Sequence, residues 1–151
     1  MKIRFTDRQT FLNIIPLLGG ATIISVNDTM REMQQVKGKI MSYSKPDYNP
    51  ELTNLIFRDD EEHFSLNQAY LVLDAVNAAY EAQRDIYVHC FMGVSRSGAI
   101  AKFANEYLGL GDVHLDGYQN YNKHVFTMLC RVAKMGFDPA DSLLMNTKKE
   151  S

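Results

Sequence analysis

The segment from residue 89 to residue 98 carries the residue types and spacing that best fit a chemical step. Cys90 follows a short apolar run that predicts a strand over residues 86–88, and it precedes a predicted helix that begins at Ser95 or Arg96. At a helix N-terminus, unpaired backbone N–H groups and the helix dipole favour an anion, and they also favour the thiolate form of a cysteine. We therefore interpret Cys90 as a candidate nucleophile.

The residues after Cys90 indicate what the nucleophile would attack. Five residues separate Cys90 from Arg96, which is enough chain to curl several backbone N–H groups around one oxyanion. The planar guanidinium of Arg96 can bind two phosphate oxygens at once, which a lysine cannot do. Gly93 and Gly98 permit a tight turn and a close approach of the backbone. A lone cysteine after a strand is more often a small buried apolar residue, but this combination indicates a phosphate-binding loop that contains a thiol.

The run His-Cys-Phe-Met-Gly-Val-Ser-Arg-Ser-Gly resembles the signature loop of the protein tyrosine phosphatase superfamily, His-Cys-x5-Arg-Ser/Thr, and it is most similar to the dual-specificity branch. The resemblance implies that Cys90 forms a phosphocysteine intermediate. It also implies that Arg96 and the loop amides stabilise the transition state. Ser97 would stabilise the departing thiolate, and His89 would order the loop without transferring protons. The implied substrate-binding residues are Phe91, Met92, Gly93, Val94, Ser95 and Arg96. Helix capping is the alternative role for Ser97, and it is the only role expected of the Ser95 side chain. The implied chemistry needs neither a metal nor another cofactor.

Asp59 and Asp60 are the candidates for the proton donor that such a reaction uses to expel its leaving group. In the family that the loop resembles, this acid is an aspartate on a loop about thirty residues before the cysteine, and both residues meet that spacing. Members often carry a bulky residue two positions ahead of the acid, and Phe57 therefore favours Asp59. Asp60 stays open as the alternative. Taken alone, the acidic run 59–62 would be a solvated loop before a helix.

Several further polar residues could line the same site. Asn27 and Asp28 end a predicted strand, and turn formation would also explain them. The segment 118–124 leads into the last predicted helix, and its amides could position a hydrolytic water, with Asn122 as the first choice; helix capping and turn chemistry would also explain it. Cys130 lies on the apolar face of that helix and is expected in the core, where it could form a disulfide with Cys90 if the two were close. The remaining histidines show no metal-ligand spacing: His63, His114 and His124.

Apolar runs that alternate between strand-like and helix-like spacing predict an α/β fold. We expect one domain over residues 1–145, with a central, mostly parallel sheet flanked by helices on both faces as in the dual-specificity phosphatases, and a flexible polar tail over 146–151. The predicted strands are 3–5, 21–26, 39–43, 53–57 and 86–88. The predicted helices are 7–18, 28–38, a segment opened by Ser65 and ended near Arg84, 96–108 and 121–135. In such sheets, sites gather at the carboxyl ends of strands, and Cys90 lies at such a position.

Composition limits the setting of this site. The chain has 151 residues, a net charge of −2 and a pI near 6.1, so it offers no overall attraction to nucleic acid or to an anionic membrane. It has no run of the roughly 18 apolar residues that a membrane span requires. Two cysteines are too few for a disulfide scaffold, and a free thiol survives best in a reducing compartment. We expect a cytoplasmic protein, monomeric, whose partners are phosphorylated proteins or peptides.

The loop residues that vary within the motif bear on the substrate. Phe91, Met92 and Val94 are apolar, whereas relatives that act on inositol lipids or RNA 5′ ends place lysine or other polar residues there. An apolar rim suits an aromatic phosphoester, so the hypothesis is a phosphatase for phosphotyrosine, with phosphoserine and phosphothreonine as further substrates. The alternative is a catalytically weak module that recognises phosphoproteins. Sulfurtransferases and small arsenate reductases fit less well, because their Cys–Arg spacing or loop position differs.

Overall fold

The computed structural model describes residues 1–43, 45–60 and 63–134. Within these residues, four parallel strands form one sheet. The strands are β1 (Ile3–Asp7), β2 (Thr22–Asn27), β3 (Glu51–Ile56) and β4 (Ile86–Cys90). Their order across the sheet is β1-β4-β2-β3, and all three neighbouring pairs are parallel. The strand that carries Cys90 therefore lies inside the sheet, with a neighbour on each side.

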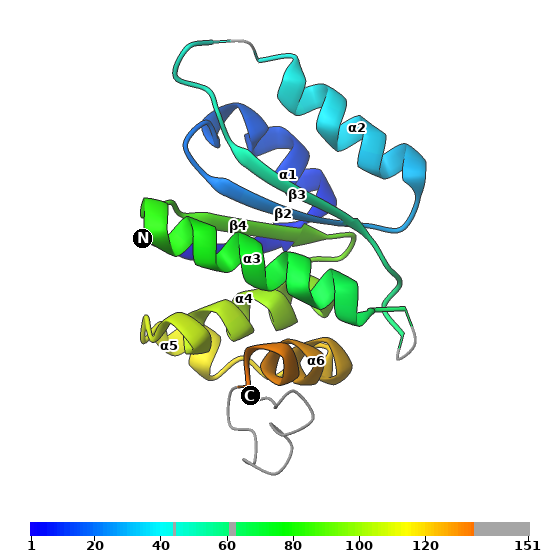
Figure 1. The fold of residues 1–151 in the computed structure, drawn as a ribbon. Coiled ribbons are helices and arrows are strands. Elements are labelled where there is room, and N and C mark those ends of the chain that lie inside the picture. Colours follow the sequence, from blue (N-terminus) through cyan, green and yellow to red (C-terminus); the bar gives the residue numbers. More distant parts are fainter. Residues whose placement is uncertain (44, 61–62, 135–151) are drawn as a thin grey trace.

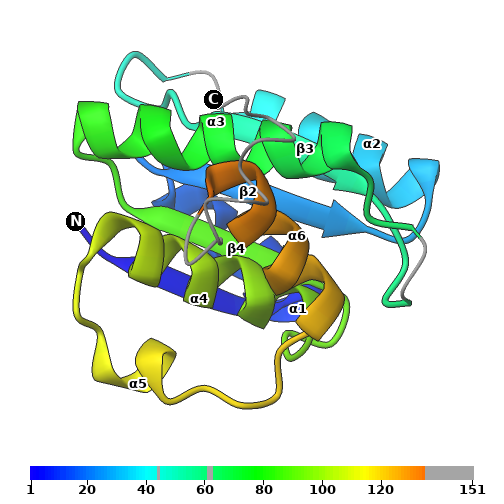
Figure 2. The same cartoon turned by 60° about the horizontal axis from the view of Figure 1, so that its bottom comes forward.

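Helices cover both faces of this sheet (Figure 1). One face is covered by α1 (Arg8–Ile14), the short 3-10 helix η1 (Ile15–Leu17) and α2 (Met30–Met41). The other face is covered by α3 (Leu66–Ala82) and α4 (Arg96–Leu108), on which α6 (Lys123–Ala133) packs. Figure 2 shows α6 lying across α3 and α4, and the short helix α5 (Val113–Asp116) set apart beside α4. Parallel strands buried between two helical layers are the arrangement that the sequence predicts.

Each helical layer has its own apolar core against the sheet. Phe11, Ile15 and Val36 are fully buried on the α1–α2 side. The larger core lies on the other side, where Phe103 of α4 and Leu129 of α6 are fully buried. Arg96 through Asn105 are all buried, so α4 is the central helix of its layer. The buried residues along α4 therefore fix the position of its first turn, which lies next to the Cys90 loop.

The predicted α/β architecture is confirmed, and one predicted strand is wrong. Residues 39–41 continue α2 to Met41, because Thr29 caps the start of that helix and Ile40 packs one turn after the buried Val36. Gly38 was expected to end the helix, but it lies on the exposed side, where glycine is tolerated at a cost of about 1 kcal/mol. Helix α5 was not predicted. The predicted tail, and the end of the domain after residue 134, lie outside the described residues.

The carboxyl ends of the strands meet at one edge of the sheet, because all the strands run the same way. Asp7 pairs with Cys90 in the β1–β4 register, and Ser25 pairs with His89 in the β2–β4 register. Asp28 follows β2, and Phe57 follows β3. This edge is where ligands bind in open α/β sheets. Within the described residues, none of the helices is both long enough and apolar enough to span a membrane.

Candidate active site

Cys90 is the last residue of β4, and a five-residue loop joins it to the first turn of α4. The residue is almost fully buried, and its Sγ lies 3.1 Å from the Ser97 Oγ. Ser97 is also buried, in the first turn of α4. A hydroxyl at this distance can donate a hydrogen bond to a thiolate, so the structure brings together the two residues that the sequence paired.

Gly93 is required by the way the loop rests on β1. Its φ is +71°, a left-handed conformation that other residues rarely adopt. A Cβ at this position would lie 2.3 Å from the Asp7 backbone nitrogen. The next loop contact is a hydrogen bond from the Arg8 N–H to the Phe91 carbonyl at 3.2 Å. The loop is therefore pressed against the junction of β1 and α1.

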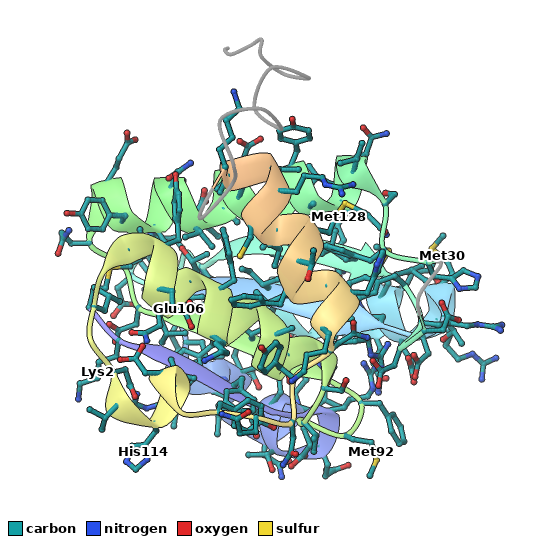
Figure 3. All side chains as sticks on the ribbon, turned by 90° about the horizontal axis from the view of Figure 1, so that it is seen from below. Lys2, Met30, Met92, Glu106, His114 and Met128 are labelled. Atoms are coloured by element: carbon teal, nitrogen blue, oxygen red, sulfur yellow. The ribbon has the colours of Figure 1, made fainter. Side chains whose placement is uncertain are left out.

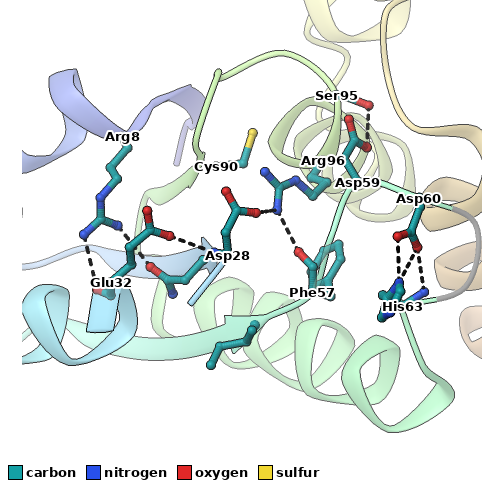
Figure 4. Close-up of polar contacts among 12 residues, drawn as sticks. Arg8, Asp28, Glu32, Phe57, Asp59, Asp60, His63, Cys90, Ser95 and Arg96 are labelled. Atoms are coloured by element: carbon teal, nitrogen blue, oxygen red, sulfur yellow. Dashed lines mark hydrogen bonds and ion pairs between the residues drawn. The ribbon is translucent and has the colours of Figure 1, made fainter. Parts of the chain in front are cut away.

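Arg96 is buried, and its guanidinium is held from one side. Its Nη1 donates to Asp28 Oδ1 and to the Phe57 carbonyl oxygen, both at 2.7 Å. These partners follow β2 and β3, so two neighbouring strand ends fix the orientation of the guanidinium (Figure 4). Within the described part of the chain, the hydrogen bonds of this side chain all involve Nη1, which leaves Nη2 and Nε for an anion.

Asp59 lies against the loop. Its Oδ1 accepts hydrogen bonds from the Ser95 hydroxyl at 2.9 Å and from the Asn122 side-chain amide at 2.6 Å. The Asn122 backbone N–H donates to the Ser95 carbonyl at 2.9 Å, and its Oδ1 caps α6 by accepting from the Val125 N–H. Within the described residues, both side-chain hydrogen bonds of Asp59 reach Oδ1, and none reaches Oδ2.

Asp60 has different surroundings. Its carboxylate bonds to the His63 ring at 2.6 and 2.7 Å and accepts from the His63 backbone N–H (Figure 4). Both side chains are about half exposed. The described contacts thus tie Asp60 to the turn before α3, whereas those of Asp59 tie it to the Cys90 loop.

A buried polar network lies beneath the loop. His89 is fully buried and stacked on Phe11, and its Nε2 lies 2.6 Å from the Ser25 Oγ. Burial lowers the pKa of His89 to about 4, although the Cys90 backbone opposes this effect. The imidazole is therefore neutral at pH 7, which suits a role in ordering the loop. Its Nδ1 has no hydrogen-bond partner among the described residues.

The same network reaches α1 through Asn27, which is buried. Its Nδ2 donates to the Ser25 Oγ at 3.2 Å, and its Oδ1 accepts from Arg8 Nη1 at 3.1 Å. Arg8 is also buried, and its Nη2 donates to the Gln35 side chain of α2. These contacts engage both Nη atoms of Arg8 with uncharged oxygens, and they hold Arg8 beneath the loop.

The rim of the loop is apolar and exposed. Phe91 is 52% exposed, Met92 is 70% exposed and Val94 is 40% exposed. Figure 3 shows Met92 extending outward from the edge of the molecule. On the other side of the loop, a hollow of about 610 Å³ is bounded by Asp59, Asp60, Ser95 and Asn122 and by the first turns of α6. A ligand at Cys90 would thus meet apolar side chains on one side and polar ones on the other.

Cys130 lies on α6, facing the core. Burial, together with the nearby Glu106 carboxylate, raises the pKa of Cys130 to about 11. Both cysteines are free thiols. Cys130 packs against the core but is only partly buried, so the expected core position is found in part. The raised pKa makes this thiol a poor nucleophile at neutral pH.

Sequence reasoning about individual residues was incomplete in three places. Helix capping was the only role expected of the Ser95 side chain, and this is wrong, because its hydroxyl donates to Asp59 and makes no capping bond to α4. The sequence left two roles open for Asp28, turn formation and contact with the site. In the structure, Asp28 pairs with Arg96. Arg8 was not singled out, and its position directly after a strand was the available signal.

The fold resembles that of solved phosphatase structures. No protein-family model matches the chain, and a search of curated proteins finds no match. Among solved structures, the PTP-2 phosphatase of Cydia pomonella aligns with a TM-score of 0.57 and 15% identity, over 85% of this chain and 84% of that one. Tk-PTP in its active form aligns with a TM-score of 0.55 and 12% identity, over 89% and 93% of the two chains. PTPMT1 in complex with PI(5)P aligns with a TM-score of 0.56 and 11% identity, over 88% and 90%.

These likenesses cover nearly the whole of each chain at low identity, so they concern the fold. The protein has the α/β fold of the protein tyrosine phosphatase superfamily, as the resemblance of the Cys90 loop predicts. Fold alone does not determine function, so the function of this protein depends on the residues of its own site.

Proposed function

We propose that this protein is a cysteine-dependent phosphatase that hydrolyses phosphotyrosine in proteins, with phosphoserine and phosphothreonine as further substrates. The observation that carries the proposal is the arrangement around Cys90. A buried thiol lies 3.1 Å from the Ser97 hydroxyl, at the start of a helix whose first residue is an arginine held by Asp28. A thiol, an arginine fork and a helix N-terminus at one point suit an attack on a phosphoryl group.

In the first proposed step, the Cys90 thiolate attacks phosphorus, and the bond between phosphorus and the leaving oxygen breaks. Nη2 and Nε of Arg96, with the loop amides, hold the non-bridging oxygens, where charge is stabilised in the transition state. Asp59 Oδ2 gives its proton to the leaving oxygen, which departs as a phenol or an alcohol. The product of this step is phosphocysteine and an Asp59 carboxylate.

In the second proposed step, water attacks the phosphocysteine. Asp59 takes a proton from the water, and the sulfur–phosphorus bond breaks to release inorganic phosphate and the Cys90 thiolate. Ser97 donates its hydroxyl proton as a hydrogen bond to the departing sulfur, at the distance already present in the structure. Neither proposed step requires a metal or another cofactor.

The rim supports an aromatic phosphoester as substrate. Phe91, Met92 and Val94 offer exposed apolar surface beside the loop, where the ring of a phosphotyrosine could pack. A polyphosphorylated head group would instead meet the carboxylates of Asp28, Asp59 and Asp60 near the same mouth. These charges disfavour inositol lipids and RNA ends, so we propose a phosphorylated protein or peptide as the partner and a monomer in the reducing cytoplasm as the working form.

Hydrolysis of para-nitrophenyl phosphate in the presence of a metal chelator tests the proposal. We expect turnover by the wild type and none by Cys90→Ser. Wild-type protein that binds a phosphotyrosine peptide without hydrolysing it would overturn the enzyme in favour of a binding module. Turnover that persists in Cys90→Ser would overturn the mechanism. A panel of phosphotyrosine, phosphoserine and phosphothreonine peptides, with an inositol phosphate as comparison, then tests the substrate class.

A further inference from the structure

The loop of the proposed phosphatase binds an anion only if its peptide groups turn their N–H bonds inward. A trans peptide is planar, and its C=O and the following N–H point in opposite directions. A carbonyl that is bound from outside the loop therefore sends the next N–H toward the loop interior. Two carbonyls are bound in this way by backbone N–H groups, which no side-chain change removes: the Phe91 carbonyl by Arg8 and the Ser95 carbonyl by Asn122.

The third anchored carbonyl is that of Val94, and its donor is a side chain. The Tyr118 hydroxyl donates to the Val94 carbonyl at 2.8 Å. Tyr118 lies in the segment between α5 and α6, far from the loop in sequence. The planar Val94–Ser95 peptide then directs the Ser95 N–H to the side opposite Tyr118. This N–H lies directly before the first turn of α4, among the amides that would face a phosphate.

The Tyr118 ring is itself fixed in place. A Cβ on Gly98 would lie 2.5 Å from the ring, so glycine at this position of α4 makes room for it. Phe5 of β1 packs against the ring edge-to-face, with 5.0 Å between centroids. Burial, and to a smaller extent the Cys90 charge, raises the pKa of Tyr118, so the hydroxyl keeps its proton at neutral pH. It is therefore a permanent donor to the loop.

We infer that Tyr118 is a positioning residue for the anion site: its hydroxyl holds the Val94–Ser95 peptide with the Ser95 N–H turned toward the bound phosphate. This inference rests on the proposed function of the Cys90 loop. Without the hydroxyl, the Val94 carbonyl loses its outside partner and the peptide can rotate, which removes one donor from the loop interior.

Tyr118→Phe tests the inference, because it removes the hydroxyl and keeps the ring against Gly98. We expect the Kd for inorganic phosphate and for orthovanadate, measured by calorimetry, to rise about fivefold to tenfold, as the loss of one hydrogen bond implies. In turnover of para-nitrophenyl phosphate, both kcat/KM and kcat should fall. The matched control is Tyr107→Phe, which removes a hydroxyl bonded to the Asn77 side chain of α3 at 2.9 Å, away from the loop.

The outcomes separate the inference from the proposed function. Phosphate affinity of Tyr118→Phe within twofold of the wild type, or an equal loss in Tyr107→Phe, overturns the inference. A wild type that binds phosphate without hydrolysing any phosphoester, together with weaker binding by Tyr118→Phe, would uphold the inference and overturn the proposed function. A wild type that binds neither phosphate nor vanadate overturns both. Thermal unfolding of each variant identifies losses caused by general destabilisation.

Discussion

The Asp28 carboxylate and the Arg96 guanidinium form a 2.7 Å ion pair across the mouth of the Cys90 loop, although 68 residues separate them in the chain. The guanidinium is almost fully buried, whereas the Asp28 side chain is 38% exposed. Solvent therefore screens the charge of the pair. We conclude that the pair matters mainly through the direction in which it holds the Arg96 fork.

This conclusion predicts different effects of two substitutions at Asp28. Asp28→Ala removes the hydrogen bond and should lower kcat/KM for para-nitrophenyl phosphate about tenfold, because the fork is then held by the Phe57 carbonyl alone among its described partners. Asp28→Asn retains an oxygen at the same position and should lose less. Full activity in Asp28→Ala would show that the guanidinium needs no second acceptor.

The contacts of Asp59 and Asp60 predict which carboxyl is the acid. Asp59→Asn should slow hydrolysis of phenyl phosphate about 100-fold, since a positioned general acid contributes roughly 10²- to 10⁴-fold. The loss should shrink for leaving groups of low pKa, which depart without a proton. Asp60→Asn is the matched control and should stay within about twofold, because its carboxylate bonds to His63. The reverse pattern would assign the acid to Asp60.

Ser97 should act mainly in the second step. Ser97→Ala removes the hydroxyl beside the Cys90 sulfur, and we expect release of the thiolate from phosphorus to slow about 10- to 100-fold, as the loss of a hydrogen bond to a charged group implies. Rapid-mixing experiments should then show a burst of para-nitrophenol followed by slow turnover. Ser42→Ala, which removes an exposed hydroxyl at the end of α2, is the control. A slow first step without a burst would contradict the assignment.

Burial of His89 predicts acid sensitivity of the fold. The unfolded side chain binds a proton as the pH falls below about 6.5, whereas the folded imidazole does so only near its pKa of about 4. The unfolded state therefore gains protons first, and stability falls as the pH drops from about 6.5 to 4. Urea unfolding should show a loss of about 2 kcal/mol between pH 7 and pH 5 from this group.

The matched comparison for that measurement is His89→Gln against His114→Gln, since His114 is exposed. His89→Gln should remove this loss of about 2 kcal/mol between pH 7 and pH 5 from the free energy of unfolding, whatever the effect of the substitution on stability at pH 7. His114→Gln should leave the dependence unchanged. Equal slopes in all three proteins would show that His89 is not protonated more readily in the unfolded chain.

The parts of the site that follow from local sequence were predictable. The strand, the loop and the helix around Cys90 lie within one short segment, so residue types and spacing suffice to indicate them. The layers of the fold follow from alternating apolar patterns in the same way. The misplaced strand at 39–43 shows the limit of such reasoning, because an exposed glycine was taken as the end of α2.

The parts that depend on distant contacts were not predictable. Nothing in the sequence near Arg96 points to Asp28, since their pairing arises from the order of strands across the sheet. No sequence pattern singled out Tyr118. The need for glycine at position 98 is evident only from the structure, in which the Tyr118 ring packs against Gly98. The bulky Phe57 two positions ahead favoured Asp59 over Asp60, but the contact of Asp59 with Asn122 requires α6 to be in place.

The three outside donors to the loop carbonyls come from the first residue of α1, from Tyr118 and from the residue before α6. The loop itself lies between them in the chain, so its geometry depends on segments near both ends of the described residues. During synthesis, Cys90 and Arg96 would emerge well before their last two anchors. A nascent chain that ends before Tyr118 would therefore hold Cys90 and Arg96 without two of the three donors that bind the loop carbonyls.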